Sequence, residues 1–140
     1  MAATTTTTYS VVRSTVGASR AYGLLYFCYF LVPAVAGIDK FFNYLTNWQQ
    51  YIAPQIFNYI KISPQMFMQI VGVVEMAAAV LVLISPRVGG VVVGLWLWAI
   101  ICNLIPGQGN WDIALRDLGL SLGAFALAAL ASDRVRRPVS

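Results

Sequence analysis

The fold is decided by residues 64–84, which read PQMFMQIVGVVEMAAAVLVLI. A helix needs about 20 mostly apolar residues to cross the ~30 Å hydrocarbon layer of a membrane, and this stretch is long enough. Its single charged side chain is Glu75. The stretch therefore predicts a membrane span. Because a charge inside a span costs about 2.5–3.5 kcal/mol on insertion scales, we expect Glu75 to have a specific structural or functional role.

Three further segments have the same apolar character: Ala21–Ile38, Val88–Ile105 and Ile113–Ala131. Four spans cannot close a β-barrel, and an open sheet would leave backbone groups unsatisfied in lipid, so helix is favoured. The second and third loops are short, which makes the helices that they join antiparallel neighbours. We therefore predict an all-α membrane protein, an up-down bundle of four transmembrane helices.

The composition agrees with a membrane protein and excludes a soluble enzyme. Of the 140 residues, 59% are hydrophobic and 10% are charged, against about 25% charged in soluble domains. The chain has no His, and its two cysteines, Cys28 and Cys102, lie in different apolar segments. The usual zinc and haem ligands and a dithiol pair are thus missing, so we expect no intrinsic cofactor and no catalytic activity of its own.

The polar termini flank the predicted transmembrane domain, residues 21–131. Residues 1–20 include the run Thr4–Thr8 and predict a flexible tail, and residues 132–140 form a basic tail. Six of the seven arginines fall in these tails and in the second loop: Arg13, Arg20, Arg87, Arg134, Arg136 and Arg137. Their distribution predicts that both termini are cytoplasmic and does not indicate nucleic acid binding. We expect the membrane to be a bacterial inner membrane.

The first loop, Asp39 to Ser63, is long and rich in aromatic residues. One helical stripe carries Phe41, Leu45, Trp48 and Ile52, so we expect the first helix to continue to about Ala53. Ser63 as cap and Pro64 at the first position should start the next helix. The loop belongs at the membrane interface, either as an aromatic belt or as a lid over a binding site.

A polar cluster is predicted at the outer rim of the bundle. Counting ~1.5 Å per residue places Arg116 close to the outer boundary of the fourth span, within reach of acidic groups on neighbouring turns. Paired charges near a rim usually hold helices together. The predicted cluster comprises Asp39, Lys40, Asn103, Asp112, Arg116 and Asp117.

Glu75 is predicted to lie deeper, ~16 Å from the start of its span, with no basic residue close. We expect its carboxyl group to be protonated at neutral pH, because desolvation disfavours the charged form. It would then make an interhelical hydrogen bond or anchor a bound quinone, lipid or pigment. The predicted binding residues are Glu75, Tyr26, Tyr29 and Trp96.

Two small-xxx-small steps, Gly90 with Gly94 and Gly119 with Gly123, predict close helix packing. The sequence leaves open whether they pack within the bundle or against another chain.

Three stretches together carry a family resemblance: Gly37-Ile38-Asp39-Lys40, Glu75 with the following Leu81–Gly89, and Trp111–Leu118, which reads WDIALRDL. Over roughly Tyr22–Ala131 the chain resembles the DoxX-like family of small four-helix membrane proteins. The resemblance implies the four-helix architecture. It also implies a link to thiosulfate:quinone oxidoreductase, of which some relatives are subunits. The family's polar positions correspond here to Asp39, Lys40, Glu75, Arg116 and Asp117, but this chain lacks the His that several relatives carry near the end of the first span.

Two functions are compatible with these features. The first is a non-catalytic accessory subunit that docks in the bilayer on other membrane protein subunits, with an electron-transfer complex as the leading candidate. The second is a quinone-linked oxidoreductase subunit of the thiosulfate:quinone oxidoreductase type, which would need a partner to oxidise the donor.

Overall fold

The computed structural model describes residues 2–106 and 109–136. Its elements follow one another as α1 (Ala2–Phe42), η1 (Trp48–Tyr51), α2 (Ile56–Tyr59), α3 (Pro64–Ile84), α4 (Pro86–Leu104) and α5 (Trp111–Arg136). Four of them, α1, α3, α4 and α5, are long and apolar enough to cross a membrane. The chain is an integral membrane protein with the predicted all-α, four-helix architecture.

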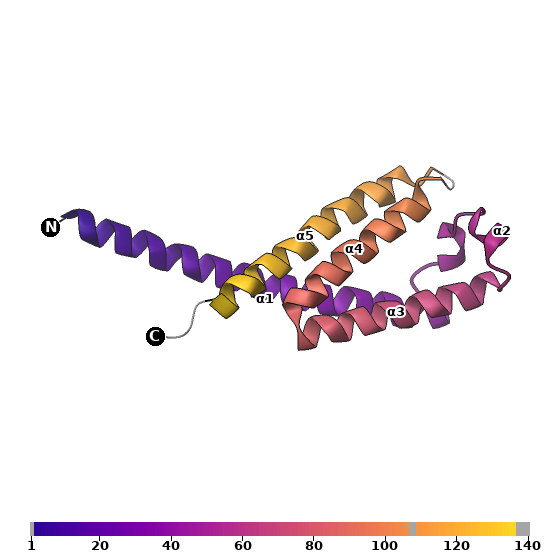
Figure 1. Ribbon diagram of the computed structural model, residues 1–140, viewed down its shortest axis with the longest axis horizontal. Coiled ribbons are helices and arrows are strands. Elements are labelled where there is room, and N and C mark those ends of the chain that lie inside the picture. The colour runs from indigo at the N-terminus through magenta and orange to yellow at the C-terminus, as the bar shows by residue number, and fades with distance from the viewer. Residues whose placement is uncertain (1, 107–108, 137–140) are drawn as a thin grey trace.

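Successive long helices run in opposite directions, and both ends of the described chain lie at the same end of the bundle (Figure 1). We call this the arginine end, because Arg87 at the start of α4 and Arg134 near the end of α5 lie there. The opposite end, which carries η1 and α2, is called the loop end. The predicted start of α3 is confirmed, since Ser63 accepts a hydrogen bond from Met66 N and Pro64 is the first helical residue.

The bundle consists of two tightly packed pairs, α1 with α3 and α4 with α5. Glycines permit this contact: a Cβ at Gly37 would lie 2.7 Å from the Gly72 carbonyl oxygen, and one at Gly72 would lie 2.6 Å from the Gly37 oxygen. Gly90 and Gly94 permit close contact between α4 and α5. A Cβ at Gly90 would meet the α5 backbone, and one at Gly94 would meet the Phe125 ring. Interior packing leaves no room for even one extra methyl group at such positions.

The predicted glycine steps therefore have different uses. Gly90 and Gly94 pack within the bundle. Gly123 faces the Tyr29 hydroxyl, whereas a Cβ at Gly119 would find nothing within 4 Å. The pair Gly37–Gly72, which is spread over two helices, was not recognised from the sequence because neither residue belongs to a small-xxx-small step.

The two pairs join at a sharp turn and diverge from it. Ser85 ends α3 and also caps α4, and Gly89 fits directly against Val82 of the preceding helix. From this turn the α3 and α4 axes separate toward the loop end (Figure 1). The main apolar core, which includes Val82, Val93 and Leu127, fills the narrow part, and the first loop occupies the wide part.

Three predicted boundaries are corrected. The flexible tail of residues 1–20 is instead helical from Ala2, because each residue added to an existing helix gains a hydrogen bond without a new nucleation step. The basic tail of 132–140 begins inside α5, and residues 137–140 lie outside the described chain. The first helix ends at Phe42 and not near Ala53.

The early end of α1 has a local cause. Asn43 adopts φ 53°, in the left-handed region, and its N–H donates to the Asp39 carbonyl oxygen at 2.6 Å. Asn is one of the few residues that tolerates this conformation, which closes the last helical turn. The chain therefore folds back over the bundle, and only a short turn of 3₁₀ helix, η1, forms at Trp48–Tyr51.

Candidate functional site

A buried ion pair joins the two helices of the α1–α3 pair. Lys40 Nζ lies 2.6 Å from Glu75 Oε2, and the two residues are 3% and 7% exposed. Lys40 Nζ also approaches the Ala36 carbonyl oxygen at 3.4 Å and lies 3.7 Å from the centre of the Trp48 ring. A carboxylate, a carbonyl oxygen and an aromatic face all favour an ammonium cation, so we assign both members of the pair as charged.

Asp39, next to Lys40, organises the loop above this pair. Its carboxylate accepts hydrogen bonds from Tyr44 N at 2.9 Å, from Leu45 N at 3.2 and 3.1 Å, and from Trp48 Nε1 at 2.7 Å. The same Trp48 ring covers the Lys40 ammonium group. Asp39 thus fixes the aromatic cover of the ion pair by satisfying backbone donors that the end of α1 leaves free.

The other pair of helices contributes two side chains to the same region. Trp96 of α4 lies beside the Glu75 carboxylate, and Asp117 of α5 is close enough to act on its charge. Trp96 Nε1 is buried but makes no hydrogen bond within the described chain. Asp117 is 4% exposed and is balanced by Arg116. We call Asp39, Lys40, Trp48, Glu75, Trp96 and Asp117 together the polar centre.

The prediction that Glu75 has no basic neighbour was wrong. The ~16 Å depth of Glu75 was counted from the start of α3, on the assumption that all helices end at one level. In the structure Lys40 lies opposite Gly72, about one turn closer to the loop end than Glu75, and its side chain extends back along α1 past the Ala36 carbonyl oxygen to reach the carboxylate. The first turns of α3 extend beyond α1 and pack against η1.

Two predicted binding residues lie elsewhere. Tyr26 donates to the Leu83 carbonyl oxygen at 3.1 Å, near the arginine end. The Tyr29 hydroxyl donates to the Leu120 carbonyl oxygen of α5. Both hydroxyls therefore tie α1 to neighbouring helices. Of the four predicted binding residues, the structure brings only Trp96 together with Glu75.

The predicted rim cluster divides into separate parts. Arg116 Nη2 lies 3.1 Å from Asp117 Oδ1, and its side chain is 65% exposed. Among the described residues, Asp112 forms no ion pair. Asp39, Lys40 and Asp117 belong to the polar centre, whereas Asn103 holds the loop. The six predicted residues therefore do not form one cluster, because α4 and α5 diverge from α1 and α3 at this end.

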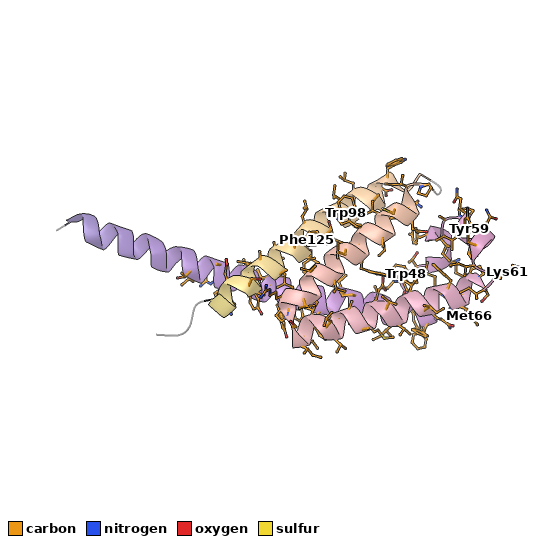
Figure 2. The ribbon with its side chains drawn as sticks, viewed as in Figure 1. Trp48, Tyr59, Lys61, Met66, Trp98 and Phe125 are labelled. Carbon is orange, nitrogen blue, oxygen red and sulfur yellow. The ribbon has the colours of Figure 1, made fainter. Side chains whose placement is uncertain are left out.

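Asn103 fastens the first loop to α4. Its side chain donates to the Tyr51 carbonyl oxygen at 2.8 Å and accepts from Ala53 N at 3.1 Å. Ile52 and Ala53 between these contacts are buried. Figure 2 shows Trp48 on the inner side of the loop and Tyr59 and Lys61 at its outer edge. The loop therefore covers the polar centre.

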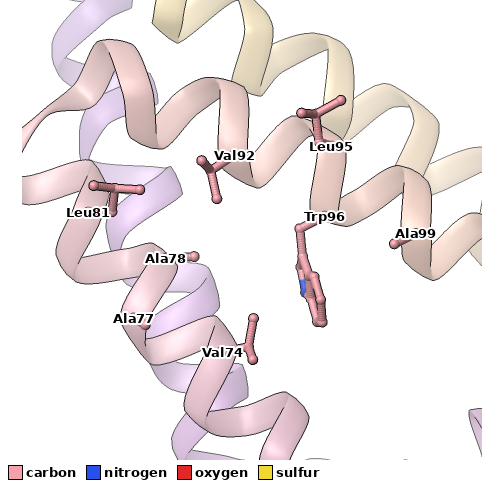
Figure 3. Close-up of a pocket in the computed structure, with 8 residues that line it drawn as sticks. All are labelled: Val74, Ala77, Ala78, Leu81, Val92, Leu95, Trp96 and Ala99. Atoms are coloured by element: carbon pink, nitrogen blue, oxygen red, sulfur yellow. The ribbon is translucent and has the colours of Figure 1, made fainter.

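An apolar cavity of about 420 Å³, open on one side to the surface of the bundle, lies between α3 and α4, next to the polar centre. Figure 3 shows the Trp96 indole extending from α4 into this space toward Val74. The walls are almost entirely aliphatic and are formed by Val74, Ala77, Ala78, Leu81, Val92, Leu95, Trp96 and Ala99. Trp96 Nε1 is buried and lies beside the Glu75 carboxylate, so this N–H is not exposed to the cavity.

Comparisons with protein-family models, with curated proteins and with solved structures found no match to this chain. The DoxX-like resemblance therefore stays a prediction from the sequence.

Removing Lys40 should destabilise the protein far more than removing both charges. Lys40→Met leaves Glu75 buried without a partner and should cost ~3–5 kcal/mol, whereas Lys40→Met with Glu75→Leu should recover much of that loss. Thermal unfolding of the purified protein, run as a double-mutant cycle, measures the difference. Additive effects of the two substitutions would contradict the assigned pair. Lys61→Met, at an exposed position, is the control.

Proposed function

We propose that this chain is a non-catalytic accessory subunit of a larger membrane complex, with an electron-transfer complex as the leading candidate. The observation that carries the proposal is the shape of α1. The helix has 41 residues and is thus about 60 Å long, twice the ~30 Å hydrocarbon layer. Its N-terminal part extends clear of the other helices (Figure 1).

Few side chains of this projecting helix pack against the bundle. Residues 16–20 are exposed, with Ser19 accepting a hydrogen bond from Arg134 of α5, and the run Thr4–Thr8 consists of a residue with poor helix propensity, about 0.7 kcal/mol worse than Ala at each position. A helix outside a bundle gains most of its stability from packing against another surface. A neighbouring subunit would supply that surface, and the DoxX-like resemblance supports a subunit role.

The proposed location is a bacterial inner membrane, with the arginine end and both termini in the cytoplasm. Arg87 at the start of α4 and Arg134 near the end of α5 support this orientation, since basic residues are in excess at the cytoplasmic ends of membrane spans. The projecting part of α1 would then reach a partner at the cytoplasmic surface.

Breaking α1 at Gly17 tests the proposal without disturbing the bundle, because a Cβ at Gly17 would contact nothing within 4 Å. Gly17→Pro removes a helical hydrogen bond and kinks the helix, so co-purifying subunits should fall by about tenfold or more. Gly17→Ala keeps the helix and is the matched control. The measurement is native mass spectrometry of the protein extracted from its own membranes in mild detergent.

Two results would contradict the accessory role. The wild-type protein could run only as a single free chain, or Gly17→Pro could retain its partners as well as Gly17→Ala does.

A second candidate is a quinone-binding subunit, and the aliphatic cavity beside Trp96 and Glu75 favours it. A quinone has an apolar body that suits these walls, and rotation of the buried Trp96 side chain would present its N–H to a quinone carbonyl oxygen. Glu75 beside this donor could exchange a proton with the head group only by giving up its pairing with Lys40. The chain would still need a partner that supplies electrons.

The quinone candidate predicts a specific effect of Trp96→Phe. Loss of one hydrogen bond, worth about 0.5–1.5 kcal/mol, should lower the quinone retained per purified chain by about 2- to 10-fold. Trp98→Phe, at a position that is 45% exposed, should leave it unchanged. Chromatography of the extracted quinone measures both. Equal retention in the two variants, or no quinone in the wild type, would remove this candidate.

A further inference from the structure

A second pocket lies at the arginine end, where α1, the α3–α4 turn and α5 meet. Its volume is about 370 Å³, and its lining includes Tyr22, Ile84, Ser85, Arg87, Ala131 and Arg134. It is separate from the polar centre and from the cavity beside Trp96, which share none of these residues. No function considered above uses it.

The pocket is positively charged and its charges are not neutralised. Arg134 Cζ stacks 4.0 Å above the Tyr22 ring, and Arg134 Nη2 donates to Ser19 Oγ at 2.5 Å. A guanidinium group has five N–H donors, so this fixed side chain keeps donors for a ligand. Within the described residues, neither Arg134 nor Arg87 forms an ion pair with a carboxylate.

The α3–α4 turn adds a second feature that suits an anion. Ser85 caps α4 with its backbone, and its hydroxyl makes no capping bond. The first residues of this 19-residue helix, Pro86 and Arg87, line the pocket. Free N–H groups and the positive end of the helix dipole both favour a phosphate at this position.

The rest of the pocket lining is partly apolar. Ile84 is 77% exposed, although it is the last residue of a helix long and apolar enough to span a membrane, and Ala131 of α5 also lines the pocket. A ligand that fits both walls has a phosphate at one end and hydrocarbon at the other. Free inorganic phosphate would use only the basic half.

We propose that this pocket binds the headgroup phosphate of an anionic phospholipid. Arg87 and Arg134 would bind the phosphate oxygens, and the acyl chains would leave along Ile84. Basic pockets between transmembrane helices are a known way of recognising anionic lipid headgroups. The proposal is independent of the accessory and quinone roles.

The test uses the full chain in detergent, titrated with phosphatidylglycerol, with phosphatidylcholine and with inorganic phosphate alone, and observed by native mass spectrometry. Phosphatidylglycerol should bind about tenfold more tightly than phosphatidylcholine, and Arg87→Gln or Arg134→Gln should remove that preference. Arg134→Gln also removes the contact with Ser19 and could change the local structure. Arg87 is exposed and makes no such contact, so Arg87→Gln tests lipid binding separately.

Arg20→Gln is the matched control, because it removes the same charge at the same end from a residue that does not line the pocket. It should keep the lipid preference. Equal loss in Arg20→Gln and Arg87→Gln would show unspecific attraction to a basic surface and overturn the proposal. Equal binding of the two lipids would also overturn it, as would binding of inorganic phosphate as tight as that of phosphatidylglycerol.

Discussion

The architecture depends on the ion pair between Lys40 and Glu75 inside an apolar bundle, in which Lys40 Nζ lies 2.6 Å from Glu75 Oε2. Either charge alone would cost several kcal/mol in this environment, so each helix is compatible with lipid only when it is next to the other. The Gly37–Gly72 contact one turn away permits the close approach that the pair needs. The pair therefore fixes both the spacing and the register of α1 against α3.

The loop end is organised around this pair. Asp39 binds Trp48, and the Trp48 ring covers the Lys40 ammonium group, so the charge is shielded by the segment that leaves α1. Asn103 then fastens the far side of the loop to α4. Because this loop fills the space between the diverging helices, the second helix pair can separate from the first without exposing the polar centre. That separation also leaves the apolar cavity beside Trp96.

The number and placement of the long helices could be predicted from the sequence because length and apolarity determine them one segment at a time. The Ser63 cap and Pro64 start were readable for the same reason. The partner of Glu75 could not be predicted in this way, because it depends on where α1 ends. That end is set by the left-handed conformation of Asn43 and by Asp39, which folds the loop back. The sequence places Lys40 at the outer end of the first span and Glu75 ~16 Å inside the second, and it does not show that the Lys40 side chain extends back along α1. Charged residues near span ends can be paired correctly only after the relative heights of the helices are known.

The charge state of the Glu75–Lys40 pair is the most direct test of this account. An infrared difference spectrum between the wild-type protein and Glu75→Gln, both in lipid vesicles at neutral pH, reports on that one side chain. The wild type should show the stretching bands of a carboxylate that the variant lacks. A band from a protonated carboxylic acid in the wild type, lost in the variant, would contradict it, because Glu75 would then be neutral and the two helices would not be held by opposite charges.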